Sequence, residues 1–186
     1  MATVRVGVTG HRRINDPDGV GAAVREALGR VRERFAGAGD LGAGGAERAE
    51  ARLEAVSPLA EGADRIVARA VLAQPGAALT VPLPFPAGDY AADFAAPASK
   101  AEFEELLARA ARVEVLPPAA TRDEGYERAG RWVVEHSDVL LALWDGAPSQ
   151  GGGGTADIVA YARERELPVY WIRTNGDAPA ISYEGG

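Results

Sequence analysis

The sequence predicts a single α/β domain of Rossmann-like build, with a doubly wound, mainly parallel sheet and helices on both faces. Strand patterns alternate with helix patterns along the whole chain, which is typical of this class. The run Val139–Leu143 is almost continuously apolar, as expected for a strand that helices cover on both faces. With 186 residues the chain is long enough for one sizeable core, so we expect one domain over residues 1–186.

The first half of the chain contains three strand patterns, in which β-branched and apolar residues stop at turn signals. These strands are Thr3–Val8, Arg52–Val56 and Ala78–Leu83. Asp16 and Pro17 supply a helix cap and a preset first turn, and apolar residues then recur at helical spacing as far as Phe35. The glycine-rich stretch 37–50 predicts a flexible connection, and another helix follows Gly62.

The second half continues the alternation. Its predicted helices are Ser99–Arg109, Asp123–Glu135 and Thr155–Arg165, and its predicted strands are Arg112–Leu116, Val139–Leu143 and Val169–Ile172. Residues 176–186 are expected to form a tail. Tyr90 and Phe94, four residues apart, are either a helical pair in a minor core or a flap over a ligand, and the core interpretation is favoured.

Open parallel sheets bind ligands outside the carboxyl ends of their strands, close to the point where the strand order reverses. Four loops follow predicted strands and carry unusual residues: Thr9–Arg12, Ser57–Asp64, the Pro/Phe segment 82–86, and Trp144–Gly146 with the glycine loop. We therefore expect these four loops to share one edge of the sheet and to contact a ligand.

The glycine loop, Gly151, Gly152, Gly153, Gly154 and Thr155, is the strongest of these signals. Consecutive glycines let the backbone approach an anion closely, and the helix start offers unpaired N–H groups, so phosphate is the expected ligand group. The alternative is a flexible tract in a glycine-rich chain. It is not a Walker A loop, because no lysine follows the glycines.

The other candidates each have two interpretations. Arg12 pairs with phosphate or is a solvated loop residue, and Glu61, Asp64 and Asp157 accept hydrogen bonds from ribose or simply favour a helix start. Trp144 is the aromatic candidate for stacking. The predicted ligand-binding residues are Gly10, His11, Arg12, Glu61, Gly62, Asp64, Trp144, Gly152, Gly153, Gly154 and Thr155.

Composition sets the expected partners. The 27 acidic residues outnumber 20 basic ones and give a formal charge of -7, which opposes binding to a polyanion, so we expect no nucleic-acid partner. The chain shows no secretory signal, no cysteine and no apolar run long enough for a membrane span, which predicts a cytoplasmic protein without membrane contact. Two histidines and no thiols predict no His/Cys metal site, and no cofactor is expected.

Three segments together resemble the SLOG superfamily, the Rossmann-like group that includes the LOG phosphoribohydrolases and nucleotide-sensing domains of bacterial signalling and defence. They are Gly7–Arg12, Ser57–Ile66 and the G-G-x-G-T pattern at Gly151–Thr155. The resemblance implies nucleotide binding and a homodimer. The hydrolases carry a Glu three positions after the Thr of their motif P-G-G-x-G-T-x-x-E, where this chain has Ile158. Gln150 stands in the position of their Pro.

These observations predict binding or sensing of a nucleotide or of an ADP-ribose-like ligand. The alternative is an enzyme that hydrolyses the N-glycosidic bond of nucleoside 5'-monophosphates, for which Glu61 and Asp157 are the only candidate catalytic residues. A purely structural or protein-interaction role ranks last, because it leaves the clustering of the four loops unexplained.

Overall fold

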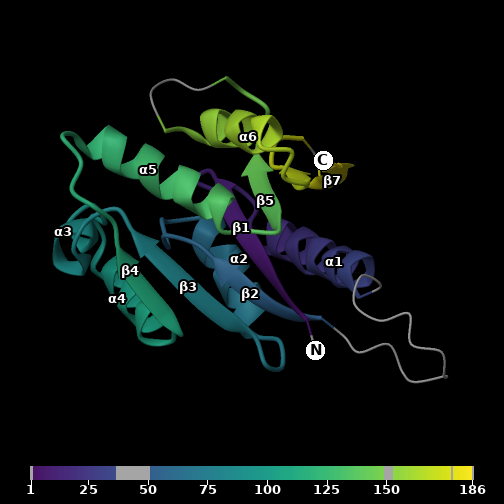
Figure 1. Cartoon of the computed structure of the whole chain (residues 1–186), viewed down its shortest axis with the longest axis horizontal. Coiled ribbons are helices and arrows are strands. Elements are labelled where there is room, and N and C mark those ends of the chain that lie inside the picture. The colour runs from purple at the N-terminus through teal and green to yellow at the C-terminus, as the bar shows by residue number, and fades with distance from the viewer. Residues whose placement is uncertain (1, 37–50, 149–152, 177, 186) are drawn as a thin grey trace.

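A seven-stranded sheet in the order β4-β3-β2-β1-β5-β6-β7 forms the centre of the computed structural model (Figure 1). The structure describes residues 2–36, 51–148, 153–176 and 178–185. The strands are β1 (Thr3–Gly10), β2 (Arg52–Val56), β3 (Ala78–Leu83), β4 (Arg112–Val115), β5 (Val139–Trp144), β6 (Val169–Arg173) and β7 (Ala180–Glu184). The first six strands pair in parallel, which confirms the predicted doubly wound α/β class.

Helices cover both faces of the sheet, as predicted. On one face lie α1 (Pro17–Phe35), α2 (Ala63–Leu72) and α4 (Pro97–Ala108), and on the other lie α5 (Arg122–Glu135) and α6 (Thr155–Glu164). The short helix α3 (Ala87–Ala91) leads into α4. Figure 1 shows α5 and α6 side by side over the middle of the sheet.

The helix starts follow from local chemistry. The Asp16 side chain accepts a hydrogen bond from the Gly19 amide at 2.9 Å, and Pro17 begins α1, as the sequence predicts. Thr121 caps α5 by accepting from the Glu124 amide at 3.2 Å, and the Glu124 carboxylate accepts from the Ala120 amide at 2.8 Å. Both helices therefore begin where side chains can satisfy amides that have no partner within the helix.

The apolar run of β5 explains its place at the centre. All six of its residues are buried, with alternate side chains directed into the two cores. Tyr90 and Phe94 are fully buried with ring centroids 5.0 Å apart, which confirms a core pair but not the expected minor core. They pack in the larger core, on the face of α1, α2 and α4.

The order in which strands are added to the sheet reverses between β1 and β5. From β1 the strands proceed outward to β4, and the chain then returns to place β5 on the other side of β1. The connections after β1 and β5 therefore lead away to opposite faces, which leaves room between them at the carboxyl edge of the sheet.

The carboxyl-terminal residues differ from the prediction. Residues 180–184, expected to be part of a tail, form β7, which pairs antiparallel with β6. Tyr183 packs on Tyr170 with ring centroids 4.9 Å apart, and the Glu184 carboxylate accepts two hydrogen bonds from Arg163 at 2.8 Å. The expected flexible connection 37–50 lies outside the described residues, and within them no helix has the length and apolar character to cross a bilayer.

Candidate functional site

A cavity of about 490 Å³ opens at the carboxyl ends of β1 and β5. All four loops that the sequence singled out contribute to it, and so does one face of α5. The predicted ligand-binding residues that line it are Gly10, His11, Arg12, Asp64, Trp144, Gly153, Gly154 and Thr155. Glu61 and Gly62 are not among the lining residues, and Gly151 and Gly152 lie outside the described residues.

The exit of β1 is fixed by close packing around Gly10. A Cβ atom at this position would lie 2.6 Å from the Leu143 carbonyl oxygen and 2.5 Å from the Ala63 Cβ, so only glycine allows β1, β5 and α2 to meet here. The His11 amide then donates to the Leu143 carbonyl at 3.1 Å. The His11 ring Nε2 lies 3.2 Å from the Asp145 amide nitrogen and 3.0 Å from its carboxylate.

Arg12 is directed into the cavity by aromatic packing. Its guanidinium lies 5.1 Å from the centroid of the Tyr126 ring on α5. Burial lowers the pKa of Arg12, but the Tyr126 side chain and the charge of Asp93 outweigh it and hold the pKa above its ordinary value. Tyr126 is in turn fixed, because its hydroxyl donates to Asp93 and its ring meets the Phe85 ring edge-on at 5.7 Å.

Among the lining residues of the cavity, Arg12 is the arginine. Among the described residues it has no ion-pair partner, whereas Arg65 is paired with Glu102 and Arg122 with Asp93. Asp64 and Asp93 act on Arg12 electrostatically but form no ion pair with it, so its guanidinium remains available to an external anion. The cavity of this acidic protein therefore holds a local cationic group.

The second wall is the turn Ser57–Asp64, which is held in an uncommon backbone conformation. Leu59 has a φ of 61°, and the turn is fixed by the Ser57 hydroxyl, which accepts from the Leu59 amide at 3.1 Å, and by the Arg65 guanidinium, which donates to the Leu59 carbonyl at 3.1 Å. Gly62, with a φ of 76°, lets the turn approach the β1 exit, and the Ala63 amide donates to the His11 carbonyl at 3.1 Å. Gly62 thus joins two loops rather than lining the cavity.

Asp64 is the buried carboxyl of this wall. Its Oδ2 accepts from the Ser57 hydroxyl at 2.9 Å and from the Ala60 amide at 3.2 Å. Burial raises the pKa of Asp64 to about 6, against the opposing effects of these hydrogen bonds and of the Arg12 and Arg65 charges. Glu61 is turned away, because its carboxylate accepts a hydrogen bond from Ser99 at the start of α4.

The third wall is the start of α6. Gly153 has a φ of 78°, and a Cβ atom there would lie 2.9 Å from the Glu127 backbone nitrogen, so this end of the glycine loop approaches α5 as only glycine can. Asp157 accepts from the Gly154 amide at 3.2 Å and so acts as a helix cap. The first amides of the helix, those of Thr155 and Ala156, have no acceptor within the helix and lie at the cavity, which makes this wall favourable to an anion.

Ile158 occupies the position where the resembling hydrolases carry Glu. Its side chain is buried against Gly130 of α5, where a Cβ atom would lie 2.4 Å from the Ile158 Cδ1. Neither of the two candidate catalytic carboxylates replaces a Glu here, since Asp157 caps α6 and Glu61 contacts Ser99. Among the described residues no three acidic or histidine side chains gather where they could share a metal ion.

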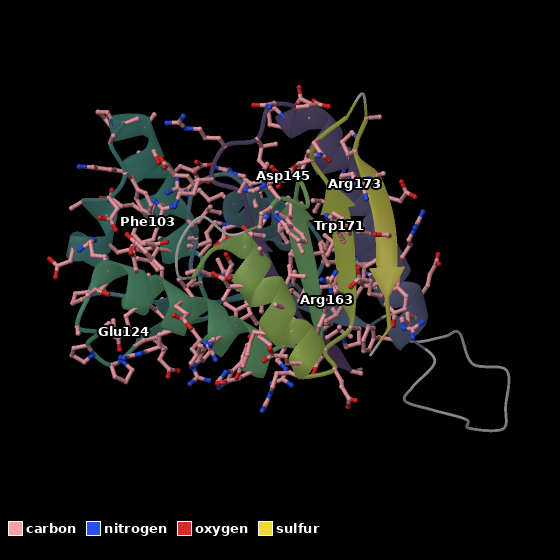
Figure 2. All side chains as sticks on the ribbon, turned by 90° about the horizontal axis from the view of Figure 1, so that it is seen from above. Phe103, Glu124, Asp145, Arg163, Trp171 and Arg173 are labelled. Atoms are coloured by element: carbon pink, nitrogen blue, oxygen red, sulfur yellow. The ribbon has the colours of Figure 1, made fainter. Side chains whose placement is uncertain are left out.

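Trp144 forms a wall of the cavity and has little free surface. Its indole N–H donates to the Ala147 carbonyl at 2.9 Å, and its ring lies 5.3 Å from that of Trp171. Asp145 follows at the rim, where the hydrogen bond from the Ala147 amide and the His11 ring hold the pKa of Asp145 below its usual range. Figure 2 shows Asp145 and Arg173 toward the same end of the sheet, with Arg163 of α6 toward the other.

Sequence analysis missed Tyr126 and Asp145. Tyr126 lies inside the predicted helix Asp123–Glu135, and Tyr126 and Gly130 reach the cavity only because they are one turn apart on the face of α5 that crosses the sheet. No local motif marks such residues. A signal did exist for Asp145, because it directly follows β5 in a loop that we expected to contact a ligand.

Comparison with known proteins establishes the fold. No protein-family model and no curated protein matches the chain. Among solved structures, DNA processing protein A from Helicobacter pylori, described for its single-stranded DNA binding mode, aligns with a TM-score of 0.56 and 16% identity over 95% of this chain and 68% of that one. DNA processing protein A (DprA) from Streptococcus pneumoniae aligns with a TM-score of 0.57 and 14% identity over 93% of this chain and 51% of that one.

These neighbours correct two expectations. The predicted sensing of a nucleotide or ADP-ribose-like ligand, and the alternative of nucleotide hydrolysis, are wrong, because the Helicobacter pylori neighbour binds single-stranded DNA. The exclusion of nucleic acid is wrong for the same reason. The exclusion rested on the formal charge of -7, which sums over the whole chain, whereas binding of a strand depends on the charges at the contact surface. At these identities, the likeness itself shows the Rossmann-like fold.

Proposed function

We propose that this chain binds single-stranded DNA at the carboxyl edge of its sheet, with the phosphate backbone held by Arg12 and by the start of α6. The observation that supports the proposal most is the unpaired Arg12 in the same cavity as the first amides of α6. An arginine fork and a helix N-terminus are both favourable partners of a phosphate oxygen. The structural neighbour that binds single-stranded DNA supports the same ligand.

The other walls suit the remainder of a nucleotide. Asp64 places a carboxyl with an elevated pKa in the cavity wall formed by the turn Ser57–Asp64, where it disfavours a second phosphate and favours a base or sugar. Gly10 and Gly153 keep the backbone close to the ligand without side chains in the way. We also propose that the chain belongs to the SLOG superfamily and that the protein is cytoplasmic, as the sequence predicts.

The test is fluorescence anisotropy with a labelled oligo-dT, measured at several salt concentrations. We expect micromolar binding at low salt that weakens as salt increases, with tighter binding to the single strand than to a duplex of equal length. Labelled oligo-rU measures whether the sugar is distinguished. If the wild-type chain shows no binding at about 50 mM salt up to about 100 µM protein, the proposed function is wrong.

Arg12→Gln is the decisive variant. Removing the charge while keeping a similar side-chain length is expected to weaken oligo-dT binding about tenfold and to reduce the slope of log affinity against log salt by about 0.7. Arg25→Gln, which removes the same charge from an exposed position on α1 outside the cavity, is the matched control. Equal affinity losses in the two variants would mean that only the total charge matters and that Arg12 has no specific role.

A further inference from the structure

A second hollow of about 460 Å³ lies beside the cavity, on the β6 side of the β1 exit. It shares His11, Arg12 and Asp145 with the cavity, and its other lining residues are Arg13, Asn15, Thr174 and Asn175. The β1 exit loop therefore forms a ridge that both spaces touch.

The ridge and the far side of the hollow are held together by backbone hydrogen bonds. The Thr174 amide donates to the Trp144 carbonyl at 3.2 Å, and the Trp171 indole N–H donates to the same oxygen at 2.9 Å. On the other side the His11 amide donates to the Leu143 carbonyl, one residue before Trp144. The end of β5 thus joins both walls, so the two spaces keep a fixed relation to each other.

The chemistry of the second hollow differs from that of the cavity. Its own residues are one arginine, two asparagines and a threonine, and none of its described lining residues is apolar. Asparagine and threonine offer donors and acceptors to base edges and sugars. Arg13 is exposed and, within the part of the chain that the structure describes, has no ion-pair partner, like Arg12.

We propose that the second hollow binds the neighbouring nucleotide of the same strand, so that single-stranded DNA crosses the β1 exit from the cavity toward Thr174 and Asn175, with Arg13 on the connecting phosphodiester. This inference rests on the proposed function. Arg12 lines both spaces and Arg13 lines only the second, so the two arginines would contact successive phosphates of the strand. A space of this size accepts one nucleotide but not a longer segment.

The test compares a ligand that can fill only the cavity with a strand that reaches both spaces. The mononucleotide thymidine 5'-monophosphate (dTMP) and the decamer (dT)10 are titrated against wild type, Arg13→Gln and Asn175→Ala, with competition anisotropy for dTMP. Arg13→Gln is expected to weaken (dT)10 about tenfold and to lower its salt slope by about 0.7, with a much smaller loss for dTMP, which has no connecting phosphodiester. Asn175→Ala is expected to weaken (dT)10 less and to leave the salt slope unchanged, because the amide carries no charge.

Two controls separate this inference from simpler explanations. Arg25→Gln reports the effect of one lost charge outside both spaces, and thermal denaturation of each variant verifies that it is folded. Photocrosslinking of (dT)10 that contains 4-thiothymidine, followed by peptide mapping, is expected to mark residues 174–175 in addition to the cavity.

The outcomes distinguish the two proposals. If wild type does not bind (dT)10, the proposed function fails, and the second hollow fails with it. If Arg12→Gln weakens (dT)10 but Arg13→Gln and Asn175→Ala do not, the cavity stands and the second hollow is overturned. An equal loss for dTMP and (dT)10 in Arg13→Gln also overturns it, because the residue would then act within the cavity.

Discussion

Asp64 shows how burial changes the chemistry of a single residue. At the helix start it satisfies the Ser57 hydroxyl and the Ala60 amide, yet burial raises its pKa from 3.8 to about 6. The cationic Arg12 and Arg65 oppose this effect without cancelling it. The folded protein therefore binds the Asp64 proton more tightly than the unfolded chain does. Because the native state then holds more protons between pH 4 and 6, Asp64 makes the protein less stable as the pH rises through that range.

We predict that Asp64→Asn removes this pH dependence. Relative to wild type, the variant should gain about 2 to 3 kcal/mol of unfolding free energy between pH 4 and pH 7.5, because it has no carboxyl to ionise in the buried site. Urea denaturation of both proteins at intervals of pH measures the difference. Glu102 and Asp138, whose pKa values are lowered, act in the opposite direction but equally in both proteins. A difference that stays constant with pH would contradict the assignment.

In the proposed binding mode, Tyr126 positions Arg12 rather than contacting the strand through its own hydroxyl. Its ring supports the guanidinium, and its hydroxyl is already used by Asp93. We predict that Tyr126→Phe retains most of the oligo-dT affinity, since the ring remains, and that Tyr126→Leu loses several-fold through the displaced arginine. Anisotropy at low and high salt measures both. If Tyr126→Phe loses as much as Tyr126→Leu, the hydroxyl itself takes part in binding.

The elements around the site are joined by turns that depend on glycine at specific positions. At Gly62 a Cβ atom would lie 2.5 Å from the His11 carbonyl oxygen and 2.4 Å from that of Arg12. The start of α2 and the exit of β1 can be neighbours only because this side chain is absent. The geometry of His11 and Arg12 at the cavity therefore depends on a residue that does not itself line it.

Gly62→Ala tests this coupling. The strained φ and the overlap with two carbonyl oxygens are expected to lower the unfolding free energy by about 2 kcal/mol or more, and to weaken oligo-dT binding at temperatures where the variant is folded. Gly29→Ala is the matched control, because a Cβ at this exposed helix position meets nothing within 4 Å. It should stabilise the protein by up to about 1 kcal/mol. Full DNA affinity in Gly62→Ala would show that the two loops are independent.

At the scale of the whole molecule, β7 covers the edge of the sheet at β6. It covers β6 with an antiparallel pairing, the Tyr183 ring lies against Tyr170, and the Arg34 guanidinium lies 4.3 Å from the Tyr183 ring centroid. Without β7 the edge of β6 would be free to pair with another chain. The net charge belongs to this scale as well: it governs solubility, while local groups such as Arg12 govern which anion binds.

A chain ending at Gly176 is therefore expected to be less stable and prone to association. Loss of the Tyr183 packing and of the β6 pairing should cost about 3 kcal/mol, which lowers Tm by about 10 °C for a protein of this size. Differential scanning calorimetry and size-exclusion chromatography measure the two effects. Glu184→Gln, which removes only the exposed ion pair with Arg163, should change stability by less than about 1 kcal/mol. An unchanged Tm in the shortened chain would show that β7 is dispensable.

The sequence by itself determined the fold class and most of its elements. The apolar run of β5, the Asp16 cap and the turn signals after each strand are local, and local chemistry was sufficient to place them. The strand exits also predicted which loops meet, because parallel strands end at one edge of the sheet. The tertiary structure decided what periodicity cannot express: that 180–184 pairs as β7, that α5 brings Tyr126 beneath Arg12, and that Glu61 turns toward Ser99. Each of these depends on contacts between residues distant in the sequence, and the choice of anion depends on how charges are arranged in space rather than on their sum.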